Sequence, residues 1–111
     1  MVVCKVLGNV VSTNKTEKLT GLKLMVVNQI NLATGDLEGL TFISVDTVGA
    51  GEGEVVLVVN GSSARQTGQT DQKPVDSSII AIIDSIEIAG EIVFRKNAGI
   101  PTAFPIQGGN N

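Results

Sequence analysis

The feature that most constrains the fold is a series of short β-branched runs separated by turn residues. The run EVVLVVN at residues 54–60 is typical, because it is rich in valine and has glycines on both sides. Valine and isoleucine favour extended backbone, since branched side chains pack well on a pleated surface. With 42% hydrophobic and 17% charged residues, the chain also has a globular composition. These patterns predict a strand-dominated, all-β fold.

Six runs are predicted to be strands. The most ambiguous, residues 79–83, is assigned to a strand by its shortness and its isoleucines. Gly8 and Asn9 predict a bulge or bend in the first strand, and Ala89-Gly90 predicts the turn of a hairpin. The predicted strands cover residues 2–11, 24–32, 41–48, 54–60, 79–83 and 91–95.

A length of 111 residues suits one domain, predicted at residues 1–97. Residues 61–67 predict one short helical turn, because a serine near its start can cap it. Several short strands with one such turn predict a small OB-like β-barrel, since closure removes exposed strand edges. Residues 98–111 (AGIPTAFPIQGGNN) have two prolines, three glycines and no period. They predict a C-terminal tail that is disordered or docks on a neighbour.

Net charge and cysteine usage limit the partners and the compartment. The formal net charge is -3, whereas nucleic acids and anionic membranes attract basic surfaces. The single cysteine, Cys4, can form no internal disulfide. The N-terminal residues do not predict a signal peptide, and no apolar run approaches the ~18 residues that span a bilayer. A cytoplasmic protein that binds neither nucleic acid nor membrane is predicted.

The glycine cluster in VDTVGAGEGEVVLVVNGSSAR (residues 45–65) raises the question of a phosphate site. A dinucleotide fingerprint places G-x-G-x-x-G between a strand and a helix, so that the phosphates meet the helix N-terminus. Here the spacing is G-x-G-x-G, and a strand follows. Glu52 and Glu54 would also repel a phosphate. A tight loop between strands is therefore predicted, with no cofactor site.

A catalytic or metal site is not predicted either. The chain has no histidine, so Ser62, Ser63 and Cys4 have no imidazole to activate them as nucleophiles. Three carboxylates (Asp46, Asp76 and Asp84) have turn or cap roles as the favoured interpretation. An acid/base pair among them stays an alternative.

A second class of function is a small OB-like binding module for an oligonucleotide or a small ligand. Single-strand binders stack bases on aromatic side chains above a basic groove. This chain has only Phe42, Phe94 and Phe104 as aromatics, and its lysines are scattered. The binding module is therefore kept only as the alternative.

Four segments together resemble the EutN/CcmL family of bacterial microcompartment vertex proteins. The third is the most specific, because VGAGxGE followed by a strand and GSSAR is hard to obtain by chance. The resemblance extends from Met1 to about Lys96 and does not include the tail. The segments are KVLGNVVST (5–13), LTGLKLMVV (19–27), VDTVGAGEGEVVLVVNGSSAR (45–65) and PVDSSIIAIIDSI (74–86).

The resemblance implies a structural protein without enzymatic activity. Members of the family are small barrels related to the OB-fold that assemble into cyclic homopentamers. These pentamers close the vertices of a polyhedral shell in the cytoplasm, and hexameric shell proteins form its facets. Curvature at the vertices would be the contribution of this chain.

The resemblance also implies which residues form assembly or pore surfaces. Small residues in the glycine cluster would let copies of one loop approach each other near the five-fold axis. Arg65 is either an interface residue or a solvated one, and Lys23 is either a charged contact or simply solvated. The candidates are Gly49, Ala50, Gly51, Gly53, Gly61, Ser62, Ser63, Ala64, Arg65 and Lys23.

Overall fold

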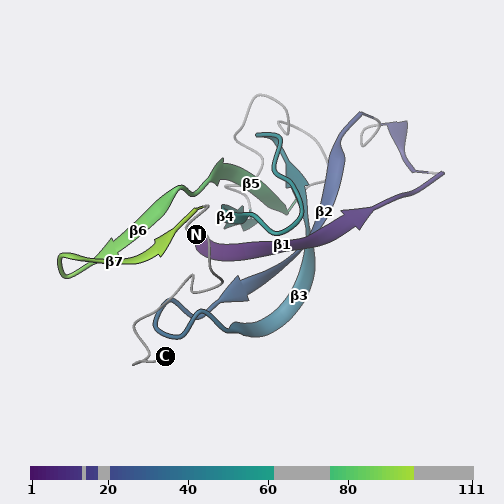
Figure 1. The fold of residues 1–111 in the computed structure, drawn as a ribbon. Coiled ribbons are helices and arrows are strands. Elements are labelled where there is room, and N and C mark those ends of the chain that lie inside the picture. The colour runs from purple at the N-terminus through teal and green to yellow at the C-terminus, as the bar shows by residue number, and fades with distance from the viewer. Residues whose placement is uncertain (14, 18–20, 62–75, 97–111) are drawn as a thin grey trace.

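The computed structural model describes residues 1–13, 15–17, 21–61 and 76–96. Five strands in this part of the chain form a closed barrel in the order β1-β2-β3-β5-β4, and β6 pairs with β7 in a separate sheet (Figure 1). The prediction of a small all-β barrel is confirmed. The strands are β1 (Val2–Val10), β2 (Lys23–Ile30), β3 (Leu37–Asp46), β4 (Val55–Asn60), β5 (Ser77–Ile82), β6 (Ser85–Ile88) and β7 (Glu91–Arg95).

The shortest strand pairing in the barrel is the one between β3 and β5. β1 pairs antiparallel with both β2 and β4, and β4 pairs antiparallel with β5. β3 and β5 run parallel, and only Val45–Ser78 and Asp46–Ile79 pair there. Among the described residues, most of β3 therefore has a partner strand on one side alone.

Two local predictions can be compared with the strands. The register of β1 against β2 shifts between Val6 and Gly8, which confirms the predicted bulge. The predicted start of the third strand at residue 41 is wrong, because β3 begins at Leu37, opposite Ile30. The physical reason is Asn31, whose amide N–H donates to the Asp36 carbonyl at 2.8 Å and brings the chain straight back.

The core inside the barrel comes from alternate residues of four strands and from one loop residue. The buried side chains pack in a single cluster with exposed fractions of 0–2%. Polar side chains also pair between neighbouring strands: Ser77 donates to Ser44 at 3.0 Å, and Thr41 donates to Asn28 at 2.6 Å. The cluster contains Cys4, Val6, Met25, Val27, Ala50, Val56, Val58 and Ile79.

The hairpin formed by β6 and β7, here called the arm, projects from the barrel (Figure 1). Its base packs against the outside of the barrel, where Val93 and Phe94 cluster with Ile30 and Val55. Ala89 and Gly90 have φ of 52° and 83°, as two-residue hairpin turns require. The predicted hairpin is confirmed.

Some predictions lie outside the described residues. Apart from Gly61, the predicted helical turn at residues 61–67 is one of them, and the predicted tail at 98–111 is another. Within the described ranges, no helix is long and apolar enough to cross a membrane.

Candidate functional site

The glycine loop, residues 49–53, folds back onto its own barrel. Ala50 is fully buried in the barrel core. The Gly53 amide donates to the Val6 carbonyl at 2.7 Å, and the Val6 amide donates to the Glu54 carbonyl at 2.9 Å. These bonds continue the pairing of β1 and β4 through the end of the loop. Within one chain, the loop therefore packs against the barrel and fills part of its interior with Ala50.

A buried carboxylate positions the start of this loop. Asp46 Oδ1 accepts the amides of Val48 and Gly49 at 3.0 and 3.1 Å. This is the cap role predicted for Asp46. Gly49 and Gly53 have φ of 81° and 88°, a conformation that residues with a Cβ rarely adopt. The backbone itself thus requires glycine at these two positions.

Lys23 contacts the loop within the same chain. Its Nζ donates to the Ala50 carbonyl at 3.4 Å and lies 3.9 Å from Asp46 Oδ2. Asp46 Oδ2 is buried and has no hydrogen-bond partner among the described residues, and the Lys23 ammonium partly offsets the cost of burying its charge. The Lys23 side chain is still 53% exposed. It stays accessible for a contact with another molecule.

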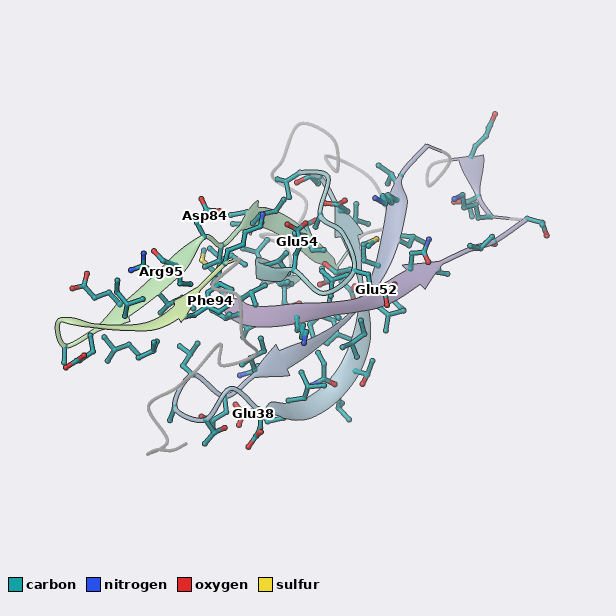
Figure 2. All side chains as sticks on the ribbon, in the orientation of Figure 1. Glu38, Glu52, Glu54, Asp84, Phe94 and Arg95 are labelled. Atoms are coloured by element: carbon teal, nitrogen blue, oxygen red, sulfur yellow. The ribbon has the colours of Figure 1, made fainter. Side chains whose placement is uncertain are left out.

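Glu54 joins the glycine loop to the arm, a connection that was not predicted from the sequence. Its Oε1 accepts the Gly51 amide at 2.7 Å, and its Oε2 lies 2.7 Å from Lys96 Nζ, just after β7. The Lys96 amide also donates to the Asp84 carbonyl at 2.7 Å, which closes the base of the arm. Figure 2 labels Glu54 and Asp84. The only sequence signal was a pair of opposite charges at distant positions.

The ionisation of Glu54 and Lys96 reflects this pairing. The hydrogen bond from Lys96, with that from the Gly51 amide, lowers the pKa of Glu54 below its ordinary value. The same bond to Glu54 raises the pKa of Lys96. Both groups are partly open to solvent. The ion pair therefore contributes modestly to stability, and salt weakens it.

Two exposed apolar surfaces stand apart from this network. At the tip of the arm, Ile88 and Ile92 are 43% and 45% exposed. Along β3, Leu40 is 84% exposed, with Leu37 and Ile43 also exposed. An exposed strand edge with large apolar side chains is a site where another chain can add.

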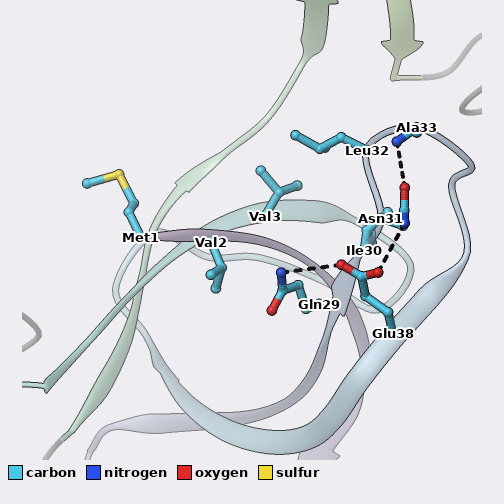
Figure 3. Close-up of a pocket in the computed structure, with 9 residues that line it drawn as sticks. All are labelled: Met1, Val2, Val3, Gln29, Ile30, Asn31, Leu32, Ala33 and Glu38. Atoms are coloured by element: carbon cyan, nitrogen blue, oxygen red, sulfur yellow. Dashed lines mark hydrogen bonds between the residues drawn. The ribbon is translucent and has the colours of Figure 1, made fainter.

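An open hollow of about 420 Å³ lies at one end of the barrel. Figure 3 shows its lining, which comes from the start of β1, the end of β2 and the following turn. The polar groups at its rim bond to one another: Glu38 accepts from Asn31 at 3.1 Å and from Gln29 at 3.5 Å. The other lining residues are Met1, Val2, Val3, Ile30, Leu32 and Ala33.

The remaining sequence candidates fall in two places. Gly61 follows β4, and its amide donates to the Asp76 carbonyl at 2.8 Å. Ser62, Ser63, Ala64 and Arg65 lie outside the described residues. In the part of the chain that is described, no three His, Cys, Asp or Glu side chains meet in an arrangement suited to a metal ion.

Cys4 points into the core, and burial raises the pKa of its thiol to about 11. A thiol with so high a pKa carries little thiolate at neutral pH. Cys4 is therefore a core residue.

Comparison with known proteins places these features in one family. The sequence model described as "Ethanolamine utilisation protein EutN/carboxysome" matches residues 1–84. The chain is 48% identical over 85 residues to the bacterial microcompartment shell vertex protein GrpN of Rhodospirillum rubrum, a match that covers 75% of this chain and 92% of GrpN.

Solved structures agree with the sequence match. The structure of CcmL from Nostoc sp. PCC 7120 superposes with a TM-score of 0.82 at 39% identity, covering 86% of this chain and all of that one. The pentameric microcompartment shell protein GrpN from R. rubrum superposes with a TM-score of 0.71 at 44% identity, covering 79% of this chain and 99% of GrpN. These chains share the whole barrel architecture with this one.

Proposed function

This chain belongs to the EutN/CcmL family, and from that membership we propose that it is a structural protein whose pentamers close the vertices of a bacterial microcompartment shell in the cytoplasm. The observation that carries the proposal is the match to pentameric GrpN, at 44% identity over 79% of this chain. At that identity and coverage the barrel fold is shared, which supports the same kind of ring.

The role needs shape rather than chemistry. Sheets of six-fold units are flat, and a closed polyhedron needs five-fold units at its corners. Hexameric shell proteins are therefore the expected neighbours of each ring. The relatives are named as shell components, which agrees with a chain that catalyses no reaction.

A five-fold ring needs two different surfaces on each subunit, because its interface is head-to-tail. We assign the tip of the arm to one side of the interface and the exposed side chains of β3 to the other. Both are apolar and unpaired within the described chain, and burial of both would stabilise a ring.

The glycine loop and the residues after β4 remain the second set of candidates. Ala50 is already buried in its own barrel, so contacts between subunits would come from the exposed parts of the loop, at Gly49 and Gly53. Arg65 and the rest of GSSAR, with the exposed side of Lys23, complete this proposed surface.

Shell reconstitution tests the function. Hexameric shell proteins of one microcompartment would be assembled with and without this chain and imaged by electron microscopy. Closed particles are expected only with the chain, and open sheets or tubes without it. A matched control carries Ile88→Asp and Ile92→Asp at the arm tip, which should remove closure and leave the barrel folded. Equal numbers of closed particles with and without the wild-type chain would refute the role.

A further inference from the structure

The hollow at the end of the barrel is lined mainly by apolar side chains. Met1, Val2, Val3 and Leu32 supply its apolar part. Glu38, its one carboxylate, already accepts hydrogen bonds from Asn31 and Gln29 (Figure 3). An occupant of this hollow should therefore be apolar and uncharged.

The base of the arm packs beside this hollow. Phe94 on β7 packs in one cluster with Val3, Ile30 and Leu32, and these three residues also line the hollow. Two residues later, Lys96 is held by its bonds to Asp84 and Glu54. The described chain is thus fixed up to Lys96, two residues after a side chain that packs beside the hollow.

The composition of residues 97–111 matches the hollow. The segment has three large apolar side chains, Ile100, Phe104 and Ile106, and no charged side chain. Pro101 and Pro105 favour extended backbone, which lowers the conformational entropy lost when such a segment binds. Ten extended residues span up to ~35 Å, which is the reach that the chain from Lys96 gives to Ile106.

We propose that residues 97–111 dock in the hollow of their own chain, with Ile100, Phe104 and Ile106 against Met1, Val3 and Leu32. Because the segment is tethered beside its site, its effective concentration there is high, and weak apolar contacts suffice. Docking would cover the exposed end of the barrel. The whole of Nostoc CcmL aligns with only 86% of this chain, so the chain has residues without a counterpart there, and this feature is not one that the family match supplies.

The test places a nitroxide near the end of the segment and observes the hollow by NMR. Gln107→Cys supplies the attachment point, and Cys4 is buried and stays unlabelled. Selective loss of the methyl signals of Val3 and Leu32 is expected. Val11, which is exposed just after the far end of β1, should keep its signal.

Two matched variants make the result specific. Phe104→Asp should restore the lost signals, because a carboxylate cannot enter the apolar hollow. Thr102→Asp adds the same charge between the apolar positions and should leave the loss in place. Equal signals for Val3, Leu32 and Val11 in the labelled parent would overturn the proposal, and so would a loss that Phe104→Asp does not reverse.

Mixing separates docking within a chain from docking on a neighbour. When the spin label and the isotopes are in the same chain, diluted with unlabelled chains, the signal loss should persist. A loss that occurs only when label and isotopes are in different chains would overturn docking on the own chain. The readout does not depend on ring formation, so failure of the vertex role would leave this result interpretable.

Discussion

The barrel and the arm use similar residues but bury them differently. In the barrel, side chains such as Val56 and Ile79 are fully buried, and the polar pairs between strands are satisfied. At the arm tip, Ile88 and Ile92 are about half exposed. A two-stranded hairpin is marginally stable alone, so the arm depends on its anchored base. The difference indicates that the barrel stabilises the fold and that the arm presents a surface.

The glycine loop belongs to the barrel side of this comparison. Its residues bond to Val6, Asp46 and Glu54 of the same chain, and Ala50 fills the core. Gly-rich sequence in a loop can thus serve the fold as well as a contact with another subunit. Only the exposed part of the loop is available for a contact with another subunit.

The largest expected effect separates the core from the arm tip. Ile79→Ala should lower the free energy of unfolding by about 2–5 kcal/mol, because it leaves a cavity in a closed core. Ile88→Ala should change it by no more than about 0.5 kcal/mol. Urea unfolding curves of both variants give the comparison. Similar losses would mean that the arm tip is part of the folding core.

The next effect divides the glycine loop into two kinds of glycine. Gly53→Ala should cost about 1–2 kcal/mol of unfolding free energy, because its positive φ strains any residue with a Cβ. Gly51→Ala is the matched control, since its new Cβ would meet only Glu54 Oε1 at an ordinary 3.6 Å. Thermal unfolding measures both. A cost at Gly51 equal to that at Gly53 would contradict this account of the loop.

The smallest effect concerns the Glu54–Lys96 ion pair between the glycine loop and the arm. The contribution of this pair to stability depends on pH. The pKa of Glu54 is lowered from its ordinary value of 4.5. Its contribution to stability is therefore present above pH 4.5 and is lost as the pH falls through the lowered pKa. The pKa of Lys96 is raised from its ordinary value of 10.5. Its contribution to stability is therefore present below pH 10.5 and is lost as the pH rises through the raised pKa. Glu54→Gln should therefore lower the melting temperature at neutral pH and match the wild type in strong acid.

Glu52→Gln is the control for this change, since Glu52 is an exposed carboxylate of the same loop. It should leave the melting temperature close to wild type at each pH. If Glu54→Gln and the wild type differ by the same amount from neutral pH down to strong acid, the Glu54–Lys96 pair does not fasten the arm.

Much of this architecture could be predicted from local sequence. Valine-rich runs and the Ala89-Gly90 turn identified strands and a hairpin, because their preferences are properties of neighbouring residues. The early start of β3 was missed, since it depends on the bonds that Asn31 makes across its turn. Distant pairs were also missed: Glu54 and Lys96 meet only after the arm packs on the barrel. Ala50 looked like a loop residue, and only the fold makes it core.

Native mass spectrometry of the intact chain tests the central claim most directly. A pentameric vertex protein should give a single ring species near five times the 11.5 kDa chain mass at micromolar concentration. The same species should persist over a range of dilutions. A clean monomer under these conditions would contradict the account.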